Sequence, residues 1–212
     1  MQKGLFVSVE GIEGVGKSTA MSYIQGWLKQ RGVKFITTRE PGGTPLAEEI
    51  RSLLLSSHEE SVSDMTELLL MFAARSQNVS QVIQPALAEG LWVLADRFTD
   101  ASMAYQGGGR GIDLDVIAQL AVMVQGNLVP DCTLLLDAPV EVGRQRIEAK
   151  NVELDRIELE QVAFFERVRQ QYLAMAQAHA RFQIIDATQS IETVQQSITE
   201  HLNGLLIKQE VG

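Results

Sequence analysis

The sequence predicts an α/β fold in which a five-stranded parallel sheet is covered by helices on both faces. Five short runs of apolar and β-branched residues alternate with longer segments whose apolar residues recur at helical spacing. The strand-like runs are nearly continuously apolar, which is typical of parallel strands buried on both faces. No repeat, low-complexity tract or linker interrupts the pattern, so we expect residues 1–212 to form one domain.

The first 55 residues contribute two strands and two helices to this prediction. In order, they are a strand at Leu5–Val9, a helix from Ser18 to about Gly32, a strand at Val33–Thr37 and a helix at Leu46–Leu55. The first helix is indicated by Ile24, Trp27 and Leu28 at helical spacing, and the Pro41-Gly42-Gly43 turn separates the last two elements.

The rest of the chain continues the alternation of strands and helices. In order, we expect a helical segment at Asp64–Glu89, a strand at Trp92–Ala95, a loop at Gly107–Gly111, a helix at Leu114–Val124, a strand at Thr133–Leu136, a helix at about Ile157–Ala178, a strand at Phe182–Ile185 and a helix to Leu206. Pro85 should bend or divide the first of these, because proline lacks the backbone N–H. Ser190 can cap the last helix. The highly charged Glu148–Arg156 segment is open to interpretation as a mobile flap or a solvated loop.

Composition narrows the class of protein. The chain has 212 residues, 45% of them hydrophobic, and a net charge of −9, which argues against a general nucleic-acid binder. Cys132 is the only cysteine, so an intrachain disulfide and a zinc–thiolate cluster are excluded. The first residues lack a signal-peptide pattern, and no 18-residue apolar run could span a membrane. We therefore expect a cytoplasmic protein with no membrane partner.

The strongest motif is a phosphate-binding loop. Gly11–Ser18 reads Gly-Ile-Glu-Gly-Val-Gly-Lys-Ser and matches G-x-x-x-x-G-K-[ST] between a predicted strand and a predicted helix. Glycines let successive backbone N–H groups face phosphate oxygens, and the helix start adds its positive dipole end. Lys17 would reach the β- and γ-phosphates and Ser18 would ligate Mg²⁺. The expected ATP-binding residues are Gly11, Ile12, Glu13, Gly14, Val15, Gly16, Lys17, Ser18 and Thr19.

Charged residues also follow two other strands. Asp96 and Arg97 come directly after the Trp92–Ala95 strand, and Arg39 follows the second strand in the same way. Ligands of open parallel sheets bind at the carboxyl ends of the strands, so the three side chains should surround one crevice. Asp96 could hold Mg²⁺ through water and Arg97 could clamp a second anion, although a surface ion pair is the alternative.

The phosphate loop does not by itself define the reaction. The guanine-reading N-K-x-D motif of regulatory GTPases is missing, and 212 residues leave little room for the oligomerisation modules of a mechanical ATPase. A small-molecule kinase of the phosphate-loop type remains.

The chain resembles the thymidylate kinase family, specifically its bacterial form with arginines in the lid. The matching stretches are Glu10–Thr19, Thr38–Thr44, Met71–Arg75, Asp96–Phe98, Ala104–Gly111 and Leu154–Glu158. The resemblance implies ATP-dependent phosphorylation of dTMP to dTDP in dTTP biosynthesis, with Mg²⁺, by a homodimer. Lys17 and Arg97 would be catalytic, and the dimer interface could involve the Met65–Phe72 and Leu114–Val124 helices.

The resemblance also assigns the dTMP site. Its expected members are Glu13, Arg39, Phe72, Arg75, Arg97, Ser102, Tyr105 and Gln106. Glu13 would bind the sugar 3′-hydroxyl, and Tyr105 would crowd the 2′ position and disfavour ribose. Phe72 would stack on thymine, Arg75 would bind the edge of the base, and Ser102 and Gln106 would line the base pocket. Phe72 also lies on the apolar face of its helix, so core packing is its alternative role.

The lid is where the chain departs from its relatives. Gly14 occupies a loop position at which other family members carry Arg, and the bacterial form compensates with lid arginines. The lid would span about residues 144–156, where Glu148 and Lys150 replace positions that are often Arg. Arg146 is the expected catalytic cation because it aligns with a lid Arg, and Lys150 is the next candidate.

Two other functions stay open at this point. A deoxynucleoside kinase would use the same loop but would need a carboxylate base beside its hydroxyl acceptor. A nucleotide-binding regulator without catalytic activity would need no basic lid.

Overall fold

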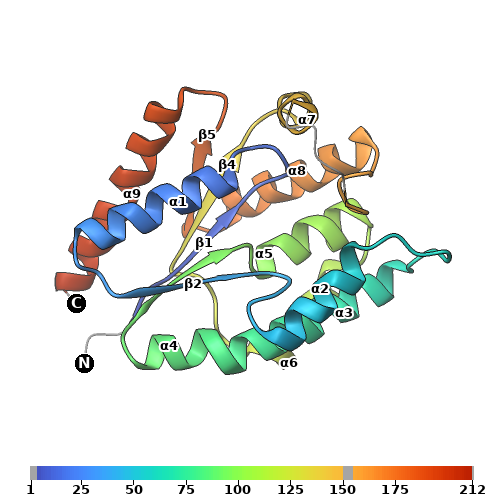
Figure 1. Cartoon of the computed structure of the whole chain (residues 1–212), viewed down its shortest axis with the longest axis horizontal. Coiled ribbons are helices and arrows are strands. Elements are labelled where there is room, and N and C mark those ends of the chain that lie inside the picture. The colour runs from blue at the N-terminus through green and yellow to red at the C-terminus, as the bar shows by residue number, and fades with distance from the viewer. Residues whose placement is uncertain (1–3, 150–154, 212) are drawn as a thin grey trace.

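The computed structural model describes residues 4–149 and 155–211 and contains the predicted sheet. Its parallel strands are β1 (Phe6–Glu10), β2 (Phe35–Arg39), β3 (Trp92–Asp96), β4 (Cys132–Asp137) and β5 (Phe182–Asp186). They are arranged in the order β2-β3-β1-β4-β5, so β1 lies in the centre (Figure 1). The predicted fold class is therefore confirmed.

The strand register brings the predicted anchors to one edge. Asp96 pairs with Val9 on one side and with Arg39 on the other. The carboxyl ends of β1, β2 and β3 are therefore level with one another. From β1 the chain passes to β2 and back to β3 on one side, and from β3 it crosses to β4 on the other side of β1. A crevice at such a reversal of strand order is where ligands of open α/β sheets bind.

Helical segments cover both faces of this sheet. They are α1 (Lys17–Gln30), α2 (Pro45–Leu55), α3 (Asp64–Asn78), η1 (Val79–Ile83), α4 (Gln84–Ala88), α5 (Thr99–Ser102), η2 (Met103–Gly109), α6 (Leu114–Gln125), α7 (Val140–Glu148), α8 (Val162–Ala178) and α9 (Ile191–Val211). Val7 and Val9 point to the face covered by α1, beside α9, whereas Phe6 points to the opposite face and packs against η1 and α4 (Figure 1). This alternation follows from the period-2 geometry of a strand.

The prediction of a loop at Gly107–Gly111 is wrong for Gly107–Gly109. Gly107–Gly109 end η2, a wide helical turn with π-type hydrogen bonding that continues directly from α5. A Cβ atom at Gly108 or Gly109 would overlap side chains of α8, including Phe164, and one at Gly107 would overlap Leu114 of α6. The glycines therefore allow close packing between helices rather than a turn.

Other boundaries shift for local reasons. The long helix α8 begins at Val162 instead of Ile157, because Asp155 accepts the backbone N–H groups of Ile157 and Glu158 and holds a turn there. Pro85 divides the Asp64–Glu89 segment as expected, and the wide turn η1 precedes it. Ser190 accepts the N–H of Thr193 and caps the last helix, which continues past Leu206 to Val211.

Two further findings concern the single cysteine and the apolarity of the helices. Cys132 begins β4 and is buried, as expected for a strand residue. Within the described ranges, no helix is both long enough and apolar enough to cross a membrane.

Candidate active site

The phosphate-binding loop lies between β1 and α1. Gly11, Gly14 and Gly16 all have positive φ angles, of 134°, 75° and 99°, which other residues rarely adopt. The Lys17 Nζ donates hydrogen bonds to the carbonyl oxygens of Gly11, at 3.1 Å, and Ile12, at 2.9 Å. Lys17 therefore closes the loop on itself and lies where donor phosphates would displace these contacts.

Burial changes the chemistry of Lys17. The pKa of Lys17 is lowered to about 8, mainly because burial removes its ammonium group from water and also because Arg97 is near, while Glu13 opposes the shift. An anion in the loop would restore the preference for the charged form.

Gly14 explains why this loop carries no second cation besides Lys17. Besides its positive φ angle, a Cβ atom at Gly14 would overlap the backbone of Gly143 in α7. The close approach of α7 therefore excludes any side chain at this position, so any further cation must come from another segment.

Asp96 and Ser18 line the same pocket as Lys17 and Arg39, together with Arg97 and Arg51. One carboxylate oxygen of Asp96, Oδ1, is buried and has no hydrogen-bond partner among the described residues. A buried acceptor without a partner is costly, so this oxygen suits a ligand that donates hydrogen bonds, such as metal-bound water.

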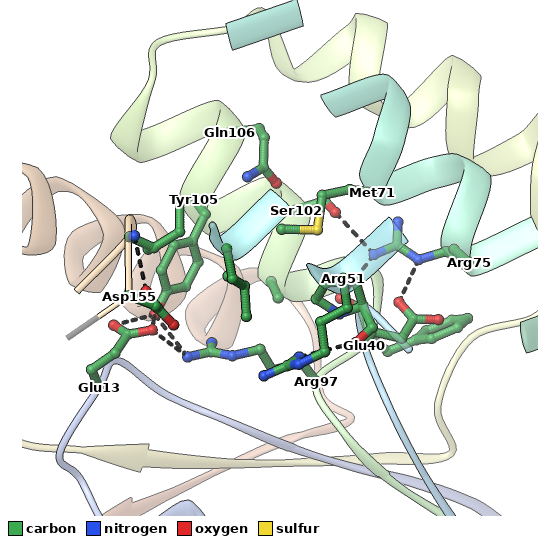
Figure 2. Close-up of a pocket in the computed structure, with 15 residues that line it drawn as sticks. Glu13, Glu40, Arg51, Met71, Arg75, Arg97, Ser102, Tyr105, Gln106 and Asp155 are labelled. Atoms are coloured by element: carbon green, nitrogen blue, oxygen red, sulfur yellow. Dashed lines mark hydrogen bonds and ion pairs between the residues drawn. The ribbon is translucent and has the colours of Figure 1, made fainter. Parts of the chain in front are cut away.

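Arg97 lies at the junction of two pockets. Its backbone has a φ of 70°, an unusual conformation for a residue with a side chain. Its guanidinium donates to Glu13 Oε1 at 2.7 Å, to the Tyr105 hydroxyl at 2.9 Å and to the Tyr172 hydroxyl at 3.2 Å. The Tyr105 hydroxyl also donates to Glu13, so two predicted site residues and Arg97 form one hydrogen-bonded cluster (Figure 2).

Glu10 holds the turn that carries Arg97. Its carboxylate accepts the N–H of Phe98 at 2.7 Å and the hydroxyl of Tyr172 at 2.7 Å. Burial raises the pKa of Glu10 to about 8, and the nearby Asp100 adds to this effect. No role for Glu10 was predicted from the sequence, although Glu10 begins one of the family stretches.

The second pocket is next to Arg97 and is enclosed mainly by helical segments (Figure 2). Arg75 enters it from α3 and is 2% exposed. Its Nε donates to Glu40 at 2.7 Å, and its Nη2 donates to Ser102 at 2.9 Å and to the carbonyl of Phe98 at 3.3 Å. Its Nη1 is buried and finds no partner in the described part of the chain, so one N–H donor group remains for a ligand.

Ser102, Tyr105 and Gln106 line this pocket as the sequence predicts, but Phe72 does not. Phe72 is 2% exposed and packs with Leu68, Ile117 and other apolar residues, with the Arg75 guanidinium 4.5 Å above its ring. The expected stacking of Phe72 on thymine therefore has no support in this arrangement. Met71, its neighbour, lines the pocket instead (Figure 2). A shift of one residue along a helix turns the side chain by about 100°, which periodicity alone could not assign.

Two further residues of these pockets were missed. Arg51 of α2 lines both of them, and its Nη1 donates to the Pro41 carbonyl at 3.0 Å. Glu40 lines both as well and is buried beside Arg75. Glu40 belongs to a family stretch, which was a usable signal, whereas nothing in the sequence distinguishes Arg51. The predicted Arg39 lines the phosphate pocket and pairs with Glu48 at 2.6 Å.

The lid residues are distributed over different places. Arg146 of α7 donates to the Ala187 carbonyl at 2.9 Å and lines a third pocket with Gly14, Thr19 and Ile191, but it does not line the phosphate pocket. Arg144 is exposed. Arg156 pairs with Glu67 at 2.6 Å. Lys150 lies outside the described residues.

A phosphate-binding loop beside a second, arginine-lined pocket with buried polar side chains is the arrangement of a nucleoside monophosphate kinase. A sequence profile of the thymidylate kinase family matches residues 9–198. The thymidylate kinase of Chromohalobacter salexigens is 55% identical over 204 residues, which cover 95% of this chain and 96% of that protein. The thymidylate kinase of Teredinibacter turnerae is 54% identical over 96% of this chain and 99% of its own length.

A solved structure gives the same result. The crystal structure of thymidylate kinase from Ehrlichia chaffeensis superposes with a TM-score of 0.77 at 30% identity, covering 95% of this chain and 99% of the other. The chain belongs to the thymidylate kinase family. As a member it transfers a phosphoryl group from ATP to dTMP, which makes dTDP for dTTP biosynthesis.

Proposed function

We propose that the two pockets hold the two substrates of this reaction, with the donor phosphates on the loop and dTMP beside Arg97. The observation that carries the assignment is that the two pockets adjoin. Glu13, Glu40, Arg51, Arg97 and Asp155 line both of them. Arg97 can therefore contact the phosphates of both substrates, which would bind next to each other.

In this arrangement the chain works by positioning and charge neutralisation. An oxygen of the dTMP phosphate attacks the γ-phosphorus of ATP, and the bond from that phosphorus to the bridging oxygen of ADP breaks. Lys17 holds the β- and γ-phosphates, while Arg97, Arg39 and Arg51 hold the dTMP phosphate. No side chain has to act as a nucleophile, because the acceptor is already an anion.

We propose Mg²⁺ as the metal of this site, with Ser18 and Asp96 as its protein contacts, Asp96 through water. The unpartnered Asp96 Oδ1 supports this choice, and oxygen donors are those that Mg²⁺ prefers. Within 4–149 and 155–211, no three His, Cys, Asp or Glu side chains form a metal cluster, in keeping with a cation held largely by substrate phosphates. When bound, the ion neutralises phosphate charge.

The third pocket is proposed as the site of the donor base. It adjoins Gly14, Gly16 and Thr19 of the loop and has apolar walls from α9, with Ile191, Val194 and Ile198 among them. In this location Arg146 would contact the donor base or sugar rather than the transferring phosphoryl group. Its catalytic role, expected from the sequence, remains a prediction that this placement does not favour.

The Arg146 assignment can be tested by steady-state kinetics. If Arg146 contacts the donor base, Arg146→Ala should raise the KM for ATP by about tenfold and leave kcat within about threefold. A large fall in kcat at unchanged KM would restore the catalytic role. Arg144→Ala is the matched control, because Arg144 is on the same helix but exposed.

We also propose a homodimer, formed through α3 and α6. These helices pack against each other, and both leave apolar side chains exposed, including Met65 and Leu69 on α3 and Val116 and Met123 on α6. Adjacent exposed apolar side chains of this kind mark an interaction surface. Val116→Glu combined with Met123→Glu should produce monomers in sedimentation analysis, while Ile184→Glu on the β5 edge should not.

A substrate panel tests the proposed function directly. With ATP and Mg²⁺, dTMP should be phosphorylated far faster than thymidine, because Arg97, Arg39 and Arg51 require an anionic acceptor. Faster turnover of thymidine would identify a deoxynucleoside kinase, and ATP binding without turnover of any monophosphate would identify a regulator. That residues 1–212 form one kinase domain in the cytoplasm stays a prediction.

A further inference from the structure

Glu67 is a buried carboxylate near the base pocket and has no role in the proposal above. It lies on α3 and is 1% exposed. It accepts the Gln106 Nε2 at 2.9 Å, the Arg156 Nη2 at 2.6 Å, and the Arg110 Nε and Nη2 at 3.3 and 3.1 Å. Glu67 therefore connects the base pocket to two arginines that lie outside it.

These contacts keep Glu67 ionised. Burial by itself would raise the pKa of this carboxyl, but the hydrogen bonds from Arg110, Gln106 and Arg156 outweigh it, and the pKa of Glu67 is lowered below its usual range. An ionised carboxylate can only accept hydrogen bonds. It must therefore face the NH₂ end of the Gln106 amide and never the oxygen end.

The orientation of Gln106 then follows. With Nε2 bound to Glu67, the amide oxygen Oε1 is directed away from that carboxylate, and it accepts no hydrogen bond from the residues that the structure describes. Gln106 itself lines the base pocket, near Ser102 and Met71 (Figure 2). On the α3 side of the same pocket, Arg75 offers the unpartnered Nη1, which can only donate.

Arg75 and Gln106 thus contribute one donor and one acceptor that have no protein partner among the described residues. Thymine offers O4, an acceptor, next to N3–H, a donor, and it matches this pair. Cytosine offers N4–H₂, a donor, next to N3, an acceptor, and it mismatches both groups. A buried mismatch is costly because neither the protein nor the base group recovers the hydrogen bond lost from water.

We propose that Glu67 is a specificity-determining positioning residue, which fixes the Gln106 amide so that the pocket accepts thymine or uracil and rejects cytosine. The proposal rests on the placement of the base in the pocket lined by Arg75 and Gln106. Glu67 does not line the pocket itself, so the proposal predicts that Glu67 acts through Gln106.

The test compares dTMP, dUMP and dCMP as acceptors for wild type and Glu67→Gln. A glutamine at position 67 can present either end of its amide, so Gln106 can turn over and offer its NH₂ to the base. The kcat/KM for dCMP relative to dTMP should rise by at least about tenfold. The dUMP to dTMP ratio should change by less than about twofold, because both bases present the same edge.

Two further variants separate the possible failures. In a Gln106→Leu background, Glu67→Gln should no longer change the dCMP to dTMP ratio, since the orienting contact is gone. Arg110→Lys is the matched control, because it disturbs another partner of Glu67 without touching Gln106, and it should keep the wild-type ratio. If Gln106→Leu itself leaves the ratio unchanged, the base does not bind where the proposed function puts it.

Other outcomes overturn the role of Glu67 alone. In the first, Glu67→Gln leaves the dCMP to dTMP ratio of kcat/KM unchanged while Gln106→Leu changes it. In the second, the dUMP to dTMP ratio rises in parallel with the dCMP to dTMP ratio, which indicates a general loss of selectivity. If Glu67→Gln does not fold, NMR of the wild type decides. The side-chain NH₂ protons of Gln106, assigned by their loss in Gln106→Leu, should exchange slowly with and without dTMP. Rapid exchange would contradict the proposal.

Discussion

The phosphate crevice and the base pocket share Arg97 but are built in different ways. In the crevice, Lys17 reaches carbonyl oxygens only six and five residues away, and the loop glycines set the geometry through backbone conformation. In the base pocket, Arg75 is held by Glu40 and Ser102, 35 and 27 residues away, and Gln106 is held by Glu67, 39 residues away. One half of the site is local in the sequence, and the other half depends on tertiary packing.

This difference has consequences for mutation. Substitutions other than to proline leave the backbone N–H groups in place, so the crevice is most sensitive at its few charged side chains. The base pocket uses buried carboxylates to hold its recognition groups, so loss of a residue that never touches the substrate should weaken both stability and selectivity.

The largest effect is expected in the crevice, at Lys17. Lys17→Ala removes the charge that serves the β- and γ-phosphates, and kcat should fall by at least about 10³-fold. The fold should be retained, because the hydrogen bonds of Lys17 within the described residues go to carbonyl oxygens of its own loop. Circular dichroism and the melting temperature are the controls, and a folded variant with near-native turnover would exclude the assigned role.

In the base pocket, the largest expected effect of a substitution is on the free energy of unfolding. Glu40→Gln leaves the Arg75 charge buried without its counter-ion, which should reduce the free energy of unfolding by about 3 kcal/mol. Glu48→Gln is the matched control. It breaks the Arg39 pair, whose side chains are 53% and 37% exposed, and should cost less than about 1 kcal/mol. Urea denaturation measures both, and equal costs would show that burial does not distinguish these pairs.

The dependence of kcat/KM on pH above neutrality tests the role of Lys17 in the crevice. With the pKa of Lys17 lowered to about 8, kcat/KM for ATP should decline above about pH 8, approaching tenfold per pH unit. Unfolding is not the cause, because a lysine pKa below its unfolded value makes Lys17 favour the folded state more as pH rises between the two values.

Lys17→Arg is the control for this titration, since arginine stays charged throughout the range. The decline should vanish in the variant even if its activity is lower. A decline that persists must come from another group, and Glu10, with a pKa of about 8, is the first candidate.

The smallest effect is expected where the two regions meet, at Tyr105. Its ring should occupy space needed by a 2′-hydroxyl, so Tyr105→Ala should improve ribo-TMP relative to dTMP by about three- to tenfold. Tyr105→Phe keeps the ring but removes the hydroxyl that binds Glu13 and Arg97. It should lower activity without changing the sugar preference. Equal ratios in all three proteins would contradict this placement.

The sequence by itself determined the fold class and which charged residues meet in the crevice. Alternating strands and helices specified a parallel sheet, and the loop motif between a strand and a helix predicts that phosphates bind there. The positions of Asp96, Arg97 and Arg39 followed because parallel strands end at the same edge of the sheet. The family resemblance added Arg75, Ser102 and Gln106 to the second pocket, where the structure also places them.

Only the tertiary structure decided which face each helical residue presents and which charges meet. Phe72 was expected in the pocket, yet packing of α3 against α6 turns it into the core and leaves Met71 at the pocket wall. The glycines at 107–109 were read as a loop, but they serve the approach of α6 and α8. Arg51, Glu40 and Glu67 gained their places through contacts across distant segments. Sequence periodicity describes one helix at a time, whereas these roles depend on the relative position of several helices, which packing alone sets.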